Sequence, residues 1–161
     1  MSATELLAKA VALWRKAYAV QMEGKLDEAV AYYKASLDVL PTAEAHTFLG
    51  WTYSFMDRLD DAIEECKKAI AIDPEFGNPW NDIGAYLIQQ GDPEAAIPYL
   101  ERALVAQRYE TYHFAHVNLG RAHLLLGRFG EAGQAFKRAL EVEPGYEPAR
   151  DALTSLIARF N

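Results

Sequence analysis

Apolar residues recur along the chain at helical spacing, and short turns rich in glycine, proline or charge separate the stretches. Each stretch has one apolar face and one polar face, as expected of helices that pack on a core. We predict nine helices, at 4–23, 26–40, 43–56, 60–72, 78–90, 93–107, 110–126, 130–142 and 146–160. The pattern therefore indicates an all-α protein.

Glycine and proline mark the predicted helix ends. Three glycines lie where the first helix of a pair must stop, a usual choice for a C-cap. Three prolines follow second helices and force the preceding residue out of the helical region. These residues are Gly24, Gly91 and Gly127, and Pro41, Pro74 and Pro144. The helices are therefore arranged in pairs.

Small residues repeat in step with the helix pairs. Three glycines inside first helices are 34 and then 36 residues apart, and three alanines in second helices keep the same spacings. A glycine inside a helix costs about 1 kcal/mol relative to alanine, so three in register imply that paired helices approach closely there. The residues are Gly50, Gly84 and Gly120, and Ala62, Ala96 and Ala132. This period indicates a solenoid of stacked repeats.

At these residues the chain resembles the tetratricopeptide repeat family, and specifically a small stand-alone domain of bacterial type. The family pattern has large-x-x-Leu-Gly-x-x-Tyr on the first helix, Ala-x-x-x-aromatic-x-x-Ala on the second, and a following proline. The second repeat supplies His46, Leu49, Gly50, Tyr53, Ala62, Cys66, Ala69 and Pro74. The third has Trp80, Ile83, Gly84, Leu87, Ala96, Leu100 and Ala103, with Arg108 in place of proline, and the fourth has His116, Leu119, Gly120, His123, Ala132, Phe136, Ala139 and Pro144. The first repeat is the loosest.

The resemblance implies one domain over residues 1–161, a right-handed α-α superhelix of four helix pairs. The repeats are expected at about 10–42, 43–76, 77–112 and 113–146, followed by a capping helix at about 146–160. The apolar stripe of that last helix includes Leu153, Leu156, Ile157 and Phe160, and a polar outer face would close the stack. The sequence is therefore expected to be complete.

Two extra residues separate the third and fourth repeats, within the segment 107–113. This segment also lacks the proline that ends the other second helices. We expect either a longer turn or extended helices there. Its tyrosines, Tyr109 and Tyr112, are available to a partner in principle, but packing beneath the turn is the favoured interpretation.

The composition argues against several classes of protein. The formal net charge is −7 and the isoelectric point is near 5.1, which disfavours nucleic acid and anionic membrane surfaces as partners. The single cysteine, Cys66, cannot form an intramolecular disulfide. The first residues lack the basic and apolar runs of a secretory signal and the lipobox cysteine of a pilus pilotin, so neither is expected, and no apolar stretch reaches membrane-spanning length. A cytoplasmic location is expected.

Few residues of the chain form a pattern typical of a metal site or a catalytic site. His113, His116 and His123 have a spacing that could place metal ligands on one face, but His116 and His123 occupy large-residue positions of the repeat and are expected to fill core space. Cys66 is expected to be buried and inert. The carboxylates from Asp57 to Glu65 suit the solvated start of a helix. No phosphate loop, nucleophile elbow or dinucleotide fingerprint occurs. We predict no enzymatic activity, no cofactor and no metal.

In the tetratricopeptide family the first helices line a concave face, at the second, fifth, ninth, twelfth and thirteenth positions of each repeat. The aromatic residues at these positions are expected to hold an apolar anchor, the amides a peptide backbone, and the arginine a carboxylate. The predicted peptide-binding residues are Trp14, Tyr18, Trp51, Phe55, Asn78, Asn81, Gln89, Phe114 and Arg121. The predicted function is a non-catalytic adaptor or scaffold for a protein or peptide partner.

Three alternatives stay open at this point. The aromatic residues could pack structurally, with Tyr18 and Trp51 between first helices and Trp14 over the end of the stack. The chain could instead self-assemble through its groove or its end helices into a homo-oligomer. An enzyme or metal protein is the least favoured. One subtype is excluded, since neither register supplies the lysine, asparagine and arginine set that clamps the carboxylate tails of chaperones.

Overall fold

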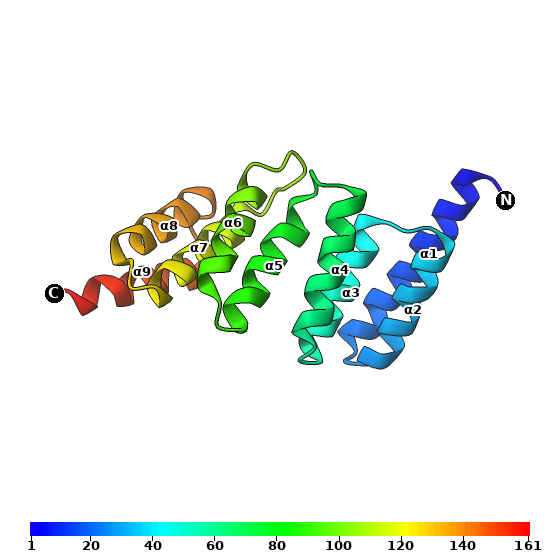
Figure 1. Ribbon diagram of the computed structural model, residues 1–161, viewed down its shortest axis with the longest axis horizontal. Coiled ribbons are helices and arrows are strands. Elements are labelled where there is room, and N and C mark those ends of the chain that lie inside the picture. The colour runs from blue at the N-terminus through cyan, green and yellow to red at the C-terminus, as the bar shows by residue number, and fades with distance from the viewer. The chain divides into compact units, whose positions relative to one another are not determined.

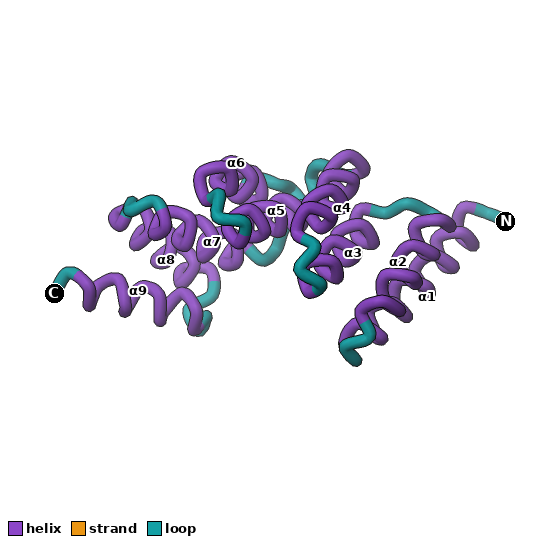
Figure 2. Tube along the Cα trace, turned by 60° about the horizontal axis from the view of Figure 1, so that its bottom comes forward, coloured by secondary structure: helices purple, strands orange, loops and turns teal.

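The computed structural model describes all residues from 1 to 161, and the chain divides into two compact units, Met1–Pro74 and Glu75–Asn161. The N-terminal unit contains α1 (Ala3–Met22), α2 (Leu26–Val39), α3 (Ala43–Phe55) and α4 (Leu59–Ile72). The C-terminal unit contains α5 (Gly77–Gln89), α6 (Pro93–Leu104), α7 (Tyr112–Leu125), α8 (Phe129–Val142) and α9 (Glu147–Arg159). Figure 1 labels these elements, and short loops join most of them within each unit (Figure 2). The all-α solenoid predicted from the pattern is confirmed.

Helices pack in the predicted pairs. In the N-terminal unit α1 packs on α2 and α3 on α4, with α2 also against α3; in the C-terminal unit α5 packs on α6 and α7 on α8. Alanines line the contact surfaces, and Ala17, Ala29, Ala62 and Ala132 are buried. That these repeats form a single domain stays a prediction.

The glycines that repeat in register lie at the closest points of the pairs. A Cβ atom added to Gly50 would lie 2.9 Å from the carbonyl oxygen of Ala62. At Gly84 and Gly120 it would lie 2.4 Å from the side chains of Leu100 and Phe136, which are their partners on the second helix. No real side chain fits at such distances, so the prediction of close approach is confirmed.

The predicted glycine C-caps are also confirmed. Gly24, Gly91 and Gly127 have φ angles of +80°, +83° and +72°, which place them in the left-handed region. The second repeat has Asp57 at this point, with a φ of +58°. An aspartate pays a steric cost in this conformation that glycine does not.

The segment with two extra residues is a longer turn, since α6 ends at Leu104 and α7 begins at Tyr112. The expected helices 93–107 and 110–126 were therefore too long. The turn is tied to the start of α5 by two backbone hydrogen bonds: Arg108 N donates to Glu75 O at 2.8 Å, and Gly77 N donates to Arg108 O at 3.0 Å. Tyr109 is buried beneath the turn with Ala103, Ala106 and Ala115, so the packing interpretation holds.

The last helix, α9, packs on α8 through its apolar stripe. Ala149 and Leu156 are buried there beside Phe136. Ile157 and Phe160, which were assigned to the same stripe, are exposed, although the Phe160 ring contacts Phe129 at a centroid distance of 5.2 Å. The outer side of α9 is therefore more apolar than expected of a cap. Across the whole chain, no helix is both long enough and apolar enough to cross a membrane.

Candidate functional site

An apolar strip runs along α1. Leu7, Val11, Trp14, Tyr18 and Met22 follow one another at steps of three or four residues, so they lie on one side of the helix. None of the five is buried, although α1 packs on α2 through its opposite side. The capping box at Ser2 and Glu5 starts α1 well before the first repeat, and this extends the strip toward the N-terminus.

Aromatic side chains from α3 meet this strip and form one cluster. Phe48 lies at its centre, with ring centroids 5.0 Å from Trp14, 5.7 Å from Tyr18 and 6.1 Å from Trp51. Phe55 continues the series, 4.9 Å from Trp51. We call Trp14, Tyr18, Phe48, Trp51 and Phe55 the aromatic cluster. The structure thus brings together all four aromatic residues predicted for the N-terminal part of the groove.

The aromatic cluster is only partly covered by protein. Tyr18 is 40% exposed and Phe55 is 57% exposed, whereas Trp14, Phe48 and Trp51 are half-buried. Half-burial and T-shaped contacts fix the rings, and the exposed edges remain available. The rings therefore pack on one another and also present apolar surface, and their role in binding a ligand stays a prediction.

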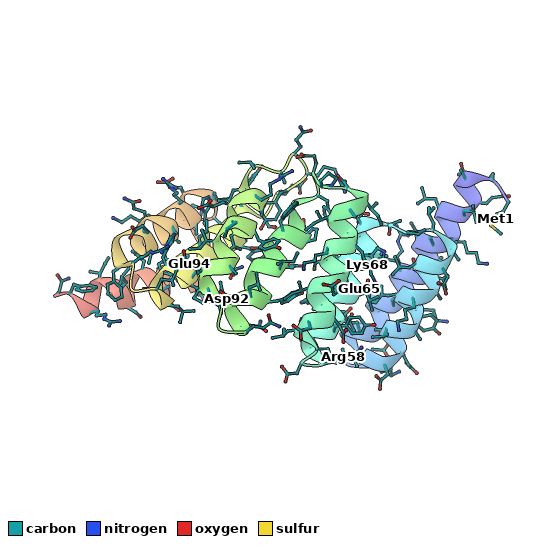
Figure 3. All side chains as sticks on the ribbon, in the orientation of Figure 1. Met1, Arg58, Glu65, Lys68, Asp92 and Glu94 are labelled. Atoms are coloured by element: carbon teal, nitrogen blue, oxygen red, sulfur yellow. The ribbon has the colours of Figure 1, made fainter.

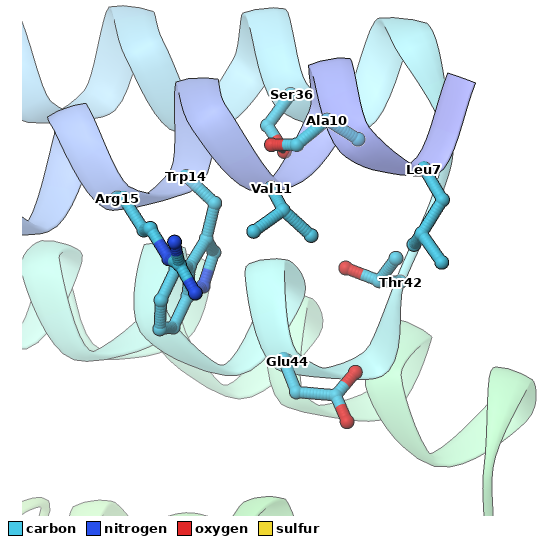
Figure 4. A pocket seen from close by; sticks show the side chains of 8 residues that line it. All are labelled: Leu7, Ala10, Val11, Trp14, Arg15, Ser36, Thr42 and Glu44. Atoms are coloured by element: carbon cyan, nitrogen blue, oxygen red, sulfur yellow. Dashed lines mark hydrogen bonds between the residues drawn. The ribbon is translucent and has the colours of Figure 1, made fainter. Parts of the chain in front are cut away.

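A pocket of about 290 Å³ lies beside the cluster, and we call it the Trp14 pocket. In Figure 4, Leu7, Val11 and Trp14 point from α1 toward Thr42 and Glu44 at the start of α3. Its walls are mainly apolar, and Arg15 and Glu44 are its only charged lining residues. The buried indole Nε1 of Trp14 has no hydrogen-bond partner. The pocket has the size and lining to accept an apolar side chain.

A second pocket, of about 360 Å³, lies at the opposite end of the same two helices. Gln21, Met22, Gly24, Leu26 and Phe55 line it, and we call it the Gln21 pocket. No charged side chain is among its lining residues. The aromatic cluster therefore lies between two apolar pockets along α1 and α3.

The predicted residues of the C-terminal unit form a more polar surface. Asn118 Nδ2 donates to Asn81 Oδ1 at 3.0 Å, and an Arg121 guanidinium nitrogen donates to Asn118 Oδ1 at 3.1 Å. Asn81 is only 8% exposed, so its amide holds α5 to α7. Arg121, Gln89 and Phe114 are exposed. The Phe114 ring makes a tilted contact with His113 and a T-shaped contact with Tyr146.

Asn78 does not belong to the hydrogen-bonded group of Asn81, Asn118 and Arg121. It lines a separate polar pocket of the same unit. That pocket, of about 390 Å³, is lined by the long turn and by the start of α5, including Phe76, Arg108 and Tyr109. Asn78 is half-buried there. The structure thus places the predicted amides in two local settings of the C-terminal unit.

Histidines and acidic residues do not assemble into a metal centre. No group of three or more His, Cys, Asp or Glu side chains is placed to hold a metal ion. His116 is half-buried, and its pKa is lowered, first by burial and then by the nearby Arg138. Cys66 is buried, as expected.

The acidic run at the start of α4 differs from expectation at Glu65. This carboxylate is buried, and it lies 2.6 Å from His46 Nδ1 and 2.9 Å from Lys68 Nζ. Figure 3 labels Glu65 and Lys68 on α4. Burial alone would raise the pKa of Glu65, but the bonds from His46 and Lys68 outweigh it and hold the pKa below its usual value. Glu65 is an internal ion-pair partner and not a solvated residue.

Sequence reasoning missed three residues of this site. Phe48 occupies the sixth position of its repeat, which was not among the inward positions considered for a ligand. Gln21 was at an inward position but was not selected, because a lone glutamine gives no signal by itself. Leu7 precedes the first repeat, although its place on the α1 strip is visible in the spacing from Val11.

Comparisons with known proteins agree with this architecture. A family model described as tetratricopeptide repeat matches residues 76–143, and another with the same description matches residues 43–76. The tetratricopeptide repeat-containing protein trd-1 of Caenorhabditis elegans is 25% identical over 143 residues, which are 86% of this chain and 18% of that protein. The chain thus spans less than a fifth of this curated relative.

Solved structures share the fold. A structure from a functional characterization of Pseudomonas aeruginosa pilF superposes with a TM-score of 0.88 at 22% identity, covering 95% of this chain and 70% of that chain. YrrB, described as a tetratricopeptide protein with an unusual peptide-binding site, has a TM-score of 0.70 at 24% identity, covering 93% of this chain and 77% of that chain. With the family models covering residues 43 to 143, the chain belongs to the tetratricopeptide repeat family.

Proposed function

We propose that the chain is a non-catalytic interaction module that binds a peptide or helix of a partner protein on the α1–α3 side of its N-terminal unit. The fold is that of a protein–protein interaction module, and proteins of this family generally bind protein partners. The observation that carries the proposal is the aromatic cluster, which is partly exposed and lies between two apolar pockets.

The binding energy would come mainly from apolar area that a partner covers. Large aromatic side chains contribute most of the binding energy at protein interfaces when a partner covers them. Here the rings are already fixed by mutual contacts, so binding orders few side chains and loses little conformational entropy. The proposed occupant places apolar side chains in the Trp14 and Gln21 pockets and lies across the aromatic cluster.

We propose a separate contact surface of a different kind on the C-terminal unit. There Arg121 would pair with a carboxylate of a bound segment, and Asn78 and Gln89 would bond the backbone of a bound segment. Phe114 would supply an apolar contact. Asn81 would act indirectly, because its amide holds Asn118, which in turn orients Arg121.

The test is a selection of displayed random peptides on the full chain, followed by calorimetry with the enriched sequences. The double variant Trp51→Ala/Phe55→Ala is expected to bind them at least about 100-fold more weakly while its helical circular dichroism stays the same. Phe160→Ala, which removes an exposed aromatic ring on α9, is the matched control and should bind like the wild type. Unchanged affinity in a folded double variant would rule out the aromatic cluster as the site.

A second candidate function is self-assembly. It is favoured by the exposed Ile157 and Phe160 on α9, because apolar residues on the open side of a terminal helix can be covered by another copy. Size-exclusion chromatography with light scattering measures the molar mass in solution and so distinguishes self-assembly from binding by a single copy. A concentration-dependent oligomer that Phe160→Ala dissociates would support assembly.

A further inference from the structure

Three polar side chains meet inside the N-terminal unit, each from a different helix. Tyr33 Oη donates to Gln21 Oε1 at 2.8 Å, and Thr52 Oγ1 donates to the same oxygen at 2.9 Å. All three residues are buried, and Gln21 is only 4% exposed. Burial raises the pKa of Tyr33, so its hydroxyl remains protonated and able to donate near neutral pH.

These bonds leave the other half of the Gln21 amide unpaired. Its Nε2 is buried and has no hydrogen-bond partner. Because the oxygen faces Tyr33 and Thr52, the planar amide directs its N–H groups away from them. Gln21 also lines the pocket formed with Met22, Gly24, Leu26 and Phe55. An unpaired buried donor lowers stability and therefore requires an explanation.

The repeat scaffold does not require this polar group. At the twelfth position, where the first repeat has Gln21, the others have Ser54, Ile88 and Leu124. At the twenty-fourth position, where the first repeat has Tyr33, the others have Cys66, Leu100 and Phe136. The helix pairs of the other repeats thus pack without a glutamine and a tyrosine at these steps. The pair is specific to the end of α1 where the pocket lies.

The chemistry of the pocket defines what it would accept. Its lining combines apolar side chains with a single fixed donor and contains no cation. A carboxylate would lose its hydration there without gaining a counter-charge, whereas a neutral carbonyl loses less. A peptide residue with a large apolar side chain offers both a group to fill the pocket and a carbonyl oxygen to accept the bond.

We propose that the Gln21 pocket binds one large apolar residue of a partner peptide, and that Gln21 Nε2 donates a hydrogen bond to a backbone carbonyl oxygen of that residue. This inference rests on the proposed function and assigns a specific contact within it. Tyr33 and Thr52 are positioning residues, because they orient the amide and do not touch the ligand.

The experiment uses N-acetyl-leucine-N′-methylamide as the probe and follows both the side-chain amide signals and the backbone amide signals of the ¹⁵N-labelled full chain by NMR. The decisive variant is Gln21→Met/Tyr33→Phe, which removes both partners of the internal bond so that no new unpaired group is created. The single hydroxyl proton of Thr52 is shared between Gln21 Oε1 and the carbonyl oxygen of Phe48, each at 2.9 Å, so in the double variant it donates to Phe48 alone. Tyr33→Phe alone separates donation from positioning, because it keeps the Gln21 donor and the bond from Thr52 but removes one of the two bonds that orient the amide.

We expect the probe to shift the Gln21 side-chain amide protons downfield in a saturable way in the wild type. The double variant should bind the probe roughly fivefold more weakly, the effect of one neutral hydrogen bond, and the affinity of Tyr33→Phe should lie between that of the double variant and that of the wild type. N-acetyl-aspartate-N′-methylamide, which carries a charge in place of the apolar group, should produce no saturable shift.

Two results would overturn the inference. Saturable shifts of Met22 and Phe55 with equal affinity in the double variant would show an apolar pocket in which Gln21 plays no part. No saturable shift at these residues would show that the pocket is not a site. Neither result removes the proposed function, which fails only if displayed peptides do not depend on Trp51 and Phe55.

Discussion

The α1–α3 side of the N-terminal unit and the α5–α7 side of the C-terminal unit occupy the same positions of the repeat but carry different side chains. At the ninth position the former has Tyr18 and Trp51, whereas the latter has Ala85 and Arg121. The helix pairs beneath are built alike, with a glycine against the second helix in each of the last three repeats. The comparison shows that the scaffold fixes where groups are presented, while individual residues decide the chemistry presented.

Buried carboxylates extend the comparison into the interior. Glu65 in the N-terminal unit has His46 and Lys68 beside it, and its pKa is lowered. Asp82 in the C-terminal unit is half-buried, and burial raises its pKa to about 7, although a hydrogen bond with Asn81 opposes the shift. One carboxylate therefore contributes stability as an anion, and the other costs stability as an anion.

The largest expected effect tests the shared scaffold. Gly120→Ala should lower the free energy of unfolding by about 3 kcal/mol, because the new methyl group overlaps the Phe136 ring by more than helix propensity can offset. Gly50→Ala should act in the same direction, since its Cβ would meet a backbone oxygen. Urea denaturation measures both. Gly130→Ala, where nothing lies within 4 Å, should be neutral or stabilising, and equal stability for Gly120→Ala would contradict close packing.

The next effect concerns Asp82. Because its folded pKa of about 7 lies above the usual 3.8, the folded chain binds a proton more tightly than the unfolded chain between these values. Stability of the wild type should therefore fall as the pH rises through this window. Asp82→Asn should be more stable than the wild type by about 2 kcal/mol at pH 8 and equally stable near pH 4. Urea unfolding of both proteins at pH 8 and pH 4 measures this. A stability difference between variant and wild type that is equal at the two pH values would contradict a raised pKa of Asp82.

A smaller effect is expected after α3, the one first helix of a pair whose end lacks a glycine in the left-handed conformation. Asp57→Gly should raise the free energy of unfolding by about 1 kcal/mol, because glycine adopts the positive φ angle at no steric cost. Thermal unfolding gives the comparison. Gly91→Ala, at the equivalent place in the C-terminal unit, should shift stability by a similar amount in the opposite direction, and a stabilising alanine there would refute the argument.

An effect of similar size is expected at Glu65, whose pKa shift is opposite in sign to that of Asp82. Its pKa is lower in the folded chain than the usual 4.5, so its contribution is present above that pH and is lost as the pH falls through the folded value. Glu65→Gln should cost about 1 kcal/mol at pH 7 and should flatten the acid limb of the stability curve. A parallel curve for the variant would mean that another carboxylate produces the acid sensitivity.

The helix order and most helix ends were predictable from sequence because their signals are local. Gly24, Gly91 and Gly127 each mark an end by themselves, and the bounds agree within a few residues. The exception was the turn after Leu104, where no proline marks the end of α6. Its course depends on hydrogen bonds to Glu75 and Gly77, which lie about thirty residues earlier.

The candidate site was predictable only where one helix position determined it. Trp14, Tyr18, Trp51 and Phe55 follow from the register of first helices, and the structure places them together. The Gln21 amide could not be found in this way, since its partners Tyr33 and Thr52 come from two other helices. The burial of Glu65 was missed for the same reason, because His46 lies on the neighbouring helix.

The backbone bonds between Arg108 and residues Glu75 and Gly77 have a consequence for how the molecule loses order. They join the start of α5 to the turn that follows α6, so the first residue of α5 cannot leave the helix without breaking a bond to that turn. Arrays of helices ordinarily melt from their free ends. The amide protons of Gly77 and Arg108 should consequently exchange with solvent at one common slow rate, because both become exposed only when this contact opens.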